Sequence, residues 1–114
     1  MEVKRSKLPK VDQQVIDEIV SRLLKAAPPG SKVILFGSHA RGDADEHSDV
    51  DVMVVEPEVE DFTKEWGRLD NALAGSMVPV DLVVASQADF DYWKDTTNTL
   101  YYRAAREGRT YEAS

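Results

Sequence analysis

The first half of the chain shows one helical and two extended patterns of apolar residues. Apolar side chains three to four positions apart predict a helix from about Pro9 to Ala26, and the Pro-Pro-Gly sequence that follows ends it. The apolar runs at residues 32–36 and 49–55 are short and bounded by turn residues, which predicts two buried strands. Between these strands, residues 39–42 have the composition of one short helical turn.

The second half continues with a helix, a third strand and two further helices. Apolar residues at helical spacing predict a helix over residues 61–74, and the apolar run at 78–85 predicts the third strand. Residues 86–89 have the form of a capping box and begin a short helix. A last helix is predicted over residues 97–107, ended by a glycine, and a short strand over 109–112.

The apolar faces of these helices identify candidate core residues. The apolar side of the first helix is expected to pack in the core, with a partner surface as the alternative. On the helix at 61–74 the apolar residues recur at spacings of four, three and four, namely Phe62, Trp66, Leu69 and Leu73. Trp93, Tyr101 and Tyr102 are also expected in the core, and together with Tyr92 they form an alternative docking face.

The order of the elements indicates one α+β domain. Only twelve residues separate Phe36 from Asp49, which is barely enough for a helical crossover, so the first two strands are expected to be antiparallel. We therefore expect a small mixed or antiparallel sheet flanked by helices. In this interpretation residues 1–8 are a basic N-terminal tail and residues 9–114 are the domain.

The composition narrows the class of protein. The chain has 114 residues, no cysteine, no signal-peptide pattern at its start and no apolar run long enough to span a membrane. We therefore expect a cytoplasmic protein without disulfide bonds, a thiolate metal site or a membrane segment.

The negative charge is concentrated in one region. The net charge is −7, whereas residues 1–10 carry a net charge of +3. Residues 43–65 hold ten carboxylates and one lysine, and such a region repels a phosphate backbone, so nucleic-acid binding is disfavoured. We interpret Glu56 to Glu65 as a solvated acidic loop followed by the start of a helix.

Three aspartates in or beside apolar strands point to metal chemistry. Asp49 and Asp51 are two positions apart, so on a strand their side chains share one face, and Asp81 interrupts the third apolar run. A carboxylate in such a run is costly without a cation or hydrogen-bond donors. Three carboxylates at a sheet surface form a site suited to Mg²⁺ or Mn²⁺. The alternatives are loop capping by the first two and an edge-strand charge for Asp81.

A Gly-Ser pair after the first strand supplies groups that bind phosphate. Gly37 lets the backbone approach a phosphate closely, Ser38 offers a hydroxyl group, and Arg41 can bind a phosphate oxygen. The alternatives are an ordinary strand-to-helix turn and a surface ion pair of Arg41. A zinc site at His39 and His47 is disfavoured, and His39 is given no role.

The order of these motifs resembles a known family. The sequences Gly37-Ser38-His-Ala-Arg41-Gly42, Ser48-Asp49-Val-Asp51 and Pro-Val-Asp81-Leu-Val resemble a minimal nucleotidyltransferase (MNT) domain of the DNA polymerase β-like superfamily. The resemblance covers about residues 30–85, and residues 100–111 are similar to the tails of such proteins.

The resemblance implies a nucleotidyltransferase fold and a role for each motif. It implies that Asp49 and Asp51 hold two Mg²⁺ ions, and that Asp81 completes the metal site and helps to deprotonate the attacking hydroxyl group. It further implies that Gly37 and Ser38 hold the triphosphate of ATP. Arg41 matches the arginine that is usual in the family.

The resemblance also implies a biological setting. Proteins of this family and size often act as antitoxins of a helical HEPN ribonuclease, in some pairs by transferring AMP from ATP onto a tyrosine of the toxin. A non-catalytic antitoxin that masks its partner is the alternative. Transfer of a nucleotidyl group to a small molecule is the least favoured of the three hypotheses, because a chain of this length has few residues left to form a pocket for the acceptor. The acceptor, the nucleobase preference and the oligomeric state, a homo-oligomer included, stay open.

Overall fold

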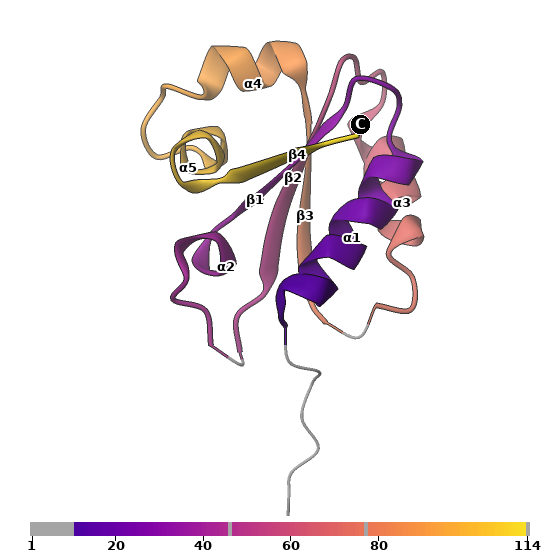
Figure 1. Cartoon of the computed structure of the whole chain (residues 1–114). Coiled ribbons are helices and arrows are strands. Elements are labelled where there is room, and N and C mark those ends of the chain that lie inside the picture. The colour runs from indigo at the N-terminus through magenta and orange to yellow at the C-terminus, as the bar shows by residue number, and fades with distance from the viewer. Residues whose placement is uncertain (1–10, 46, 77, 114) are drawn as a thin grey trace, which may run out of the picture.

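A computed structural model describes residues 11–45, 47–76 and 78–113 of the protein. In it, a four-stranded sheet lies between two layers of helices, with α1 and α3 on one face and α4 and α5 on the other (Figure 1). The elements in chain order are α1 (Gln13–Ala26), β1 (Lys32–Phe36), α2 (Ser38–Arg41), β2 (Val50–Glu56), α3 (Phe62–Ala72), β3 (Val80–Ser86), α4 (Gln87–Trp93), α5 (Leu100–Glu107) and β4 (Arg109–Glu112). The predicted α+β class is confirmed.

The sheet is mixed and has the strand order β3-β2-β1-β4. Strand β1 pairs antiparallel with both β2 and β4, which confirms the prediction for the first two strands. Strand β2 pairs parallel with β3, and the connection between them contains α3, as a parallel crossover requires. The predicted basic tail at residues 1–8 lies outside the described residues.

Side-chain caps move several helix boundaries inward from the predicted ones. The first helix begins at Gln13 and not near Pro9, which itself lies outside the described residues, because the Asp12 carboxylate accepts a hydrogen bond from the Val15 N–H at 3.0 Å. The last helix begins at Leu100 and not at residue 97, because the Thr99 hydroxyl oxygen accepts from the N–H two residues into that helix. The helix predicted over residues 61–74 ends at Ala72.

The strand boundaries differ from the predicted ones by one or two residues. The second strand runs from Val50 to Glu56, so Asp49 lies just before it. The third strand runs from Val80 to Ser86, and the Ser86 hydroxyl oxygen caps α4 as predicted, by accepting from the Asp89 N–H at 3.1 Å.

Alternate residues of the strands fill two separate cores. Toward α1 and α3, the buried strand residues are Val33, Leu35, Val50, Val52, Val54 and Leu82, and they pack against Ile16, Ile19, Val20, Leu23, Leu69 and Leu73. Toward α4 and α5, the buried residues are Ile34, Phe36, Met53, Val55, Ala85 and Ala104. The prediction that the apolar side of the first helix packs in the core is confirmed. Asp51 has the parity of Met53, so its side chain belongs to the α4/α5 face of the sheet.

Several aromatic residues on α3 and α4 are exposed, one of which was predicted in the core. Trp93 is 40% exposed, so the prediction that it lies in the core was wrong. Phe62 and Trp66, two of the apolar residues at helical spacing on α3, are 42% and 44% exposed. The helix α3 turns only its later residues toward the sheet, and the Trp66 Nε1 donates a hydrogen bond of 3.0 Å to the Leu82 carbonyl oxygen on the edge strand β3. Tyr101 and Tyr102 are half-buried.

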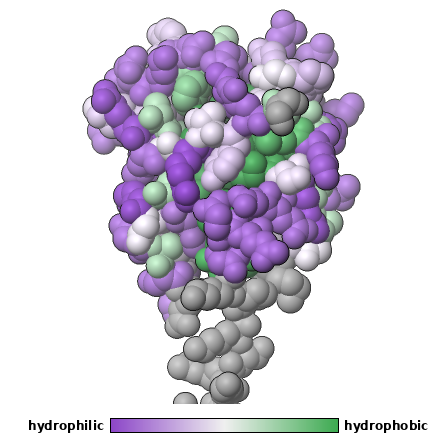
Figure 2. Space-filling view, in the orientation of Figure 1, coloured by the Kyte–Doolittle hydropathy of each residue, from purple (hydrophilic) through white to green (hydrophobic). Residues whose placement is uncertain are grey.

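The side of the molecule seen in Figure 2 is mostly hydrophilic, with one larger apolar area near the C-terminal end of the chain. Among the helices of the described residues, none combines the length and the apolar composition needed to cross a bilayer.

Glu56 is buried, which corrects its interpretation as part of a solvated acidic loop. Only 2% of the residue is exposed, and its Oε2 atom has no hydrogen-bond partner among the described residues. Burial, together with the hydrogen bond and the negative charge of Glu65, raises the pKa of the Glu56 carboxyl to about 8, although the positive charge of Arg68 opposes the rise. Arg68 binds Glu65 at both carboxylate oxygens and lowers the pKa of that group. Near neutral pH, Glu56 is therefore protonated and donates to the ionised Glu65.

This buried carboxyl makes stability depend on pH in a defined direction. The pKa of Glu56 is higher in the folded state than the ordinary value of 4.5, so its stabilisation is present at low pH and is lost as the pH rises toward about 8. We expect the free energy of unfolding to fall between pH 6 and pH 8, with a slope from this group on the order of 1 kcal/mol per pH unit. Glu56→Gln mimics the protonated form and should remove that slope.

Urea unfolding at several pH values in this range measures the effect. Glu58→Gln is the matched control, because Glu58 is exposed and carries the same charge. An equal pH slope in Glu56→Gln and the unmodified protein would contradict the assignment.

Candidate active site

Two strand pairings bring candidate site residues together at one end of the sheet. Asp51 pairs with Phe36 on β1, the residue before Gly37, and with Asp81 on β3. Residues that pair across neighbouring strands direct their side chains to the same face. The aspartates of β2 and β3, which are 30 positions apart in the sequence, are therefore neighbours on the α4/α5 face.

The predicted site carboxylates of Asp49, Asp51 and Asp81 differ in burial, but none has a hydrogen-bond or salt-bridge partner among the described residues. Asp51 is half-buried, and Asp49 and Asp81 are exposed. Within the described part of the chain, none of the three accepts a hydrogen bond or forms a salt bridge. They are acceptors without donors.

The electrostatics of Asp51 show that the carboxylates act on one another. Burial raises the pKa of Asp51 above its ordinary value, and the negative charges of Asp81 and Asp49 raise it further. Arg103 and His39 act electrostatically in the opposite direction and lower the pKa of Asp51. The negative charges of Asp49, Asp51 and Asp81 repel one another, and a cation bound beside Asp51 would attract all three.

The donor chemistry of this cluster fits a hard divalent cation. Mg²⁺ prefers oxygen ligands and commonly takes only one or two carboxylates from a protein, together with waters and substrate phosphates. Asp51 and Asp81 offer such a pair. However, across the described ranges no three or more His, Cys, Asp or Glu side chains are already grouped so that they could hold a metal ion. The predicted trio with Asp49 is therefore not preassembled.

Gly37 has a conformation and a surrounding that require glycine. Its φ is +74°, in the region that disfavours side chains, and a Cβ atom there would overlap the Oδ2 atom of Asp51. The absence of a side chain at Gly37 thus allows the Asp51 carboxylate to lie against the turn. The Gly37 N–H donates a hydrogen bond of 3.0 Å to Glu107 Oε1.

Ser38 and Arg41 begin and end the short helix α2 beside this turn. The Ser38 carbonyl oxygen accepts from the N–H groups of Gly42 and Asp43, whereas its hydroxyl group has no partner among the residues described. Arg41 donates from Nε to Asp43 Oδ2 at 3.2 Å and from a terminal nitrogen to Glu107 Oε1 at 3.1 Å. The ion pairs of Arg41, expected as an alternative, are thus present.

Sequence reasoning missed three charged residues around the cluster. Glu107 and Arg103 come from α5, and the Arg103 guanidinium lies 5.6 Å from the centre of the Phe36 ring. His39, which was given no role, has its Nε2 atom 3.5 Å from the Ser48 carbonyl oxygen and acts electrostatically on Asp51. The packing of Ala104 against β1 and the pairing of β4 with β1 hold α5 at this place, and no local sequence pattern predicts these contacts.

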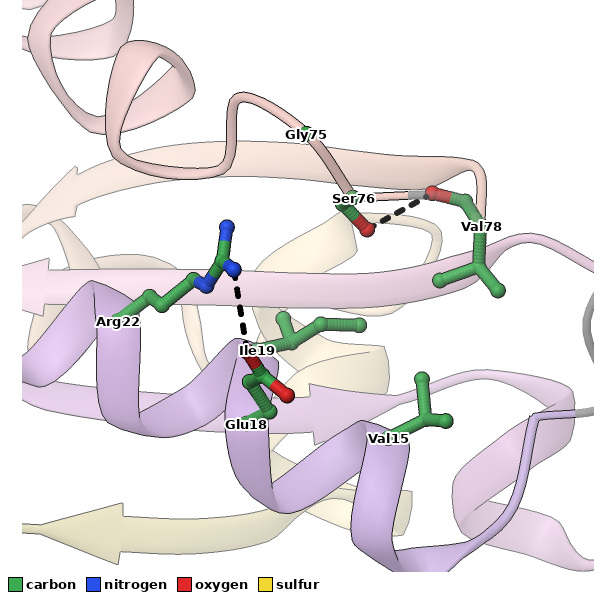
Figure 3. Close-up of a pocket in the computed structure, with 7 residues that line it drawn as sticks. All are labelled: Val15, Glu18, Ile19, Arg22, Gly75, Ser76 and Val78. Atoms are coloured by element: carbon green, nitrogen blue, oxygen red, sulfur yellow. Dashed lines mark hydrogen bonds and ion pairs between the residues drawn. The ribbon is translucent and has the colours of Figure 1, made fainter.

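A pocket of about 240 Å³ lies elsewhere, between α1 and the segment that connects α3 to β3 (Figure 3). Its lining includes Val15, Ile19 and Val78, and Arg22 spans its rim with hydrogen bonds of 3.0 Å to Glu18 and to the Ala74 carbonyl oxygen. None of the predicted site residues lines it. The carboxylate cluster, in which Asp49 and Asp81 are exposed, lies apart from this pocket.

Comparison with known proteins gives a family and several structural relatives. A profile of the nucleotidyltransferase domain family matches residues 14–105. A Methanocaldococcus jannaschii protein named as a protein adenylyltransferase is 64% identical over 28 residues, a match that spans 25% of this chain and 28% of that relative. The short match leaves most of that relative uncovered.

Solved structures confirm the fold. A Sulfolobus solfataricus protein named as a nucleotidyltransferase has a TM-score of 0.55 and 26% identity, covering 69% of this chain and 70% of its own. A MntA–HpeT toxin–antitoxin structure has a TM-score of 0.61 and 18% identity, covering 86% and 73%. A toxin–antitoxin structure with AMP-PNP has a TM-score of 0.60 and 18% identity, covering 91% and 76%. At 18% identity these last two show a shared fold.

The close approach at Gly37 predicts an effect on stability. We expect Gly37→Ala to lower the free energy of unfolding by about 1–3 kcal/mol, because the new Cβ requires strained backbone at positive φ and displaces the Asp51 carboxylate. Gly67→Ala is the control, since Gly67 lies in α3 with open space around it and should gain up to about 1 kcal/mol. Urea unfolding compares the two, and equal effects would contradict the close approach.

Proposed function

The chain belongs to the nucleotidyltransferase domain family, and from that premise we propose that it transfers AMP from ATP onto a hydroxyl group. The observation that carries the proposal is the pair of unpartnered carboxylates, Asp51 and Asp81, on neighbouring strands beside the Gly37 turn. Nucleotidyl transfer needs negative groups that hold cations next to donors that hold phosphates. Both kinds of group meet at this end of the sheet.

Each residue has a role in this reaction. Ser38 and Arg41 orient the triphosphate through the hydroxyl group and the guanidinium donors that remain free, and the Gly37 backbone approaches it closely. Asp49 and Asp51, with Asp81 completing the set, are the residues that would hold two Mg²⁺ ions. When bound, Mg²⁺ neutralises phosphate charge that would otherwise repel these carboxylates.

Asp81 also has a role in proton transfer. As the acceptor hydroxyl oxygen forms its bond to the α-phosphorus, the bond from that phosphorus to pyrophosphate breaks, and the hydroxyl proton passes to the Asp81 carboxylate. Asp81 is exposed and has no hydrogen-bond donor among the described residues, so its oxygens are free to accept.

The acceptor in this proposal is a protein, namely a tyrosine of a HEPN toxin that the chain neutralises as an antitoxin. Two observations support a protein acceptor. The relative from Methanocaldococcus jannaschii is named as a protein adenylyltransferase, and structures of the same fold are toxin–antitoxin complexes, one with AMP-PNP. The exposure of Asp49 and Asp81 also suits a hydroxyl group presented by a macromolecule.

A non-catalytic antitoxin that acts by binding is the second candidate. The observation that favours it is the set of exposed apolar residues on α4 and at the start of α5. Tyr92 is 73% exposed, Trp93 is 40% exposed and Leu100 is 43% exposed. Exposed aromatic side chains are common at protein interfaces.

The two candidates differ in what happens when the carboxylates lose their charge. We expect Asp49→Asn combined with Asp51→Asn to reduce transfer of label from α-labelled ATP to the candidate toxin, taken as the product of the gene beside the one that encodes this chain, by at least about 100-fold. The physical reason is that the cations lose two of their ligands. Removal of Mg²⁺ with a chelator should have the same effect. Asp70→Asn, an exposed aspartate on α3, is the control and should leave transfer unchanged.

Protection of cells that express the toxin completes the test. Lost protection with retained binding of the toxin supports catalysis. Full protection by the double variant would favour the non-catalytic antitoxin, and absence of label transfer by the unmodified protein would contradict the proposed reaction.

A further inference from the structure

One oxygen of Glu107 accepts two hydrogen bonds from a distant segment of the chain and forms an ion pair within its own helix. Glu107 Oε1 accepts from the Gly37 N–H at 3.0 Å and from Arg41 at 3.1 Å, and it lies 3.6 Å from a terminal nitrogen of Arg103. The Glu107 side chain is 23% exposed, less than either arginine. Hydrogen bonds between charged groups are the stronger class, and partial burial reduces their screening by water.

The backbone around Glu107 is held closely against the sheet. Glu107 is the last residue of α5, and β4 begins two residues later by pairing with β1, where Arg109 lies opposite Leu35. A Cβ atom at Gly108 would overlap the Ala104 carbonyl oxygen and the Ile34 side chain, so glycine permits this contact. Because the end of α5 is held against β1, the carboxylate of Glu107 lies beside the turn that follows β1.

We propose that Glu107 is a positioning residue, which holds the Gly37 N–H and the Arg41 guanidinium so that the turn is assembled before nucleotide binds. The proposal rests on the proposed function, in which Arg41 and the turn bind the triphosphate. Arg41 has five N–H donors and uses one for Asp43 and one for Glu107, so three remain to bind a phosphate. Glu107 fixes the direction of these three donors, and a fixed donor loses less conformational entropy on binding.

A different physical outcome is that Glu107 occupies the phosphate position and must leave when nucleotide binds. In that case its removal would strengthen nucleotide binding. Removal of the Glu107 hydrogen bonds weakens nucleotide binding in the first case and strengthens it in the second. The two cases can be told apart when the effect of the lost charge is separated from the effect of the lost hydrogen bonds.

The comparison of Glu107→Ala with Glu107→Gln makes this separation. Both variants lose the negative charge, but only glutamine keeps an oxygen that can accept from Gly37 and Arg41. We expect Glu107→Ala to bind ATP with Mg²⁺ roughly fivefold more weakly than Glu107→Gln, because about one net hydrogen bond is lost. Calorimetry measures the two dissociation constants. Equal or tighter binding by Glu107→Ala would overturn the proposal.

Inorganic triphosphate and adenosine serve as two further probes. The difference between the two variants should persist with triphosphate and vanish with adenosine, since Glu107 acts on groups that bind phosphates. A difference of the same size with adenosine would show a general loss of structure and would overturn the proposal. Should Glu107→Ala fail to fold, Glu107→Asp replaces it, because it keeps the charge while its side chain is too short to keep all its contacts. Weaker triphosphate binding than in the unmodified protein then supports the proposal, and unchanged binding overturns it.

A double-variant cycle with Arg41→Ala distinguishes failure of this inference from failure of the proposed function. If Glu107 acts through Arg41, the alanine substitution at Glu107 should weaken ATP binding less in the Arg41→Ala background than in the unmodified protein. Unchanged binding in Arg41→Ala alone would contradict the proposed phosphate site itself. Weaker binding in Arg41→Ala with no effect of Glu107→Ala would overturn only the positioning role.

Discussion

The double pairing of β2 at Asp51 is the constraint on which the candidate site depends. On one side Asp51 pairs with Phe36, which places Gly37 beside its carboxylate, and on the other side it pairs with Asp81. A shift of either register by one residue would turn a carboxylate to the opposite face of the sheet, into the apolar core against α1 and α3. The apolar residues that alternate with Asp51 on β2 thus determine the face to which its carboxylate points, as well as the packing of the core.

The charges around this point are balanced by residues from the end of the chain. The carboxylates of Asp49 and Asp81 raise the pKa of Asp51, while Arg103 on α5 acts in the opposite direction. The same helix contributes Glu107, which binds the turn at Gly37. Because β4 adds to the edge of β1 after α5, the C-terminal segment both closes the sheet on that side and completes the surroundings of the site.

Local patterns predict the elements of this fold well, and they predict the neighbouring aspartates because side chains alternate along a strand. They do not predict the burial of Glu56. Its position at the end of a buried strand places it beside Glu65 and Arg68, and these surroundings keep its carboxyl group protonated near neutral pH. Nor do they predict that Trp66 stays near the surface with its indole N–H on an edge strand. Local patterns also do not predict the contacts of Glu107. Its partners Arg41 and Gly37 lie 66 and 70 positions away in the sequence, and the fold of the sheet brings them together.

Localisation of a bound divalent cation tests the central claim most directly. Strand β2 separates the carboxylate cluster from the acidic segment after Glu56 by about 20 Å, a span that paramagnetic broadening by Mn²⁺ resolves. In amide NMR spectra at increasing Mn²⁺, we expect the signals of Gly37, Asp51 and Asp81 to broaden first, while those of Glu58 and Asp61 persist. Broadening that begins at Glu58 and Asp61 and spares Asp51 and Asp81 would contradict the claim that these neighbouring carboxylates form a cation site.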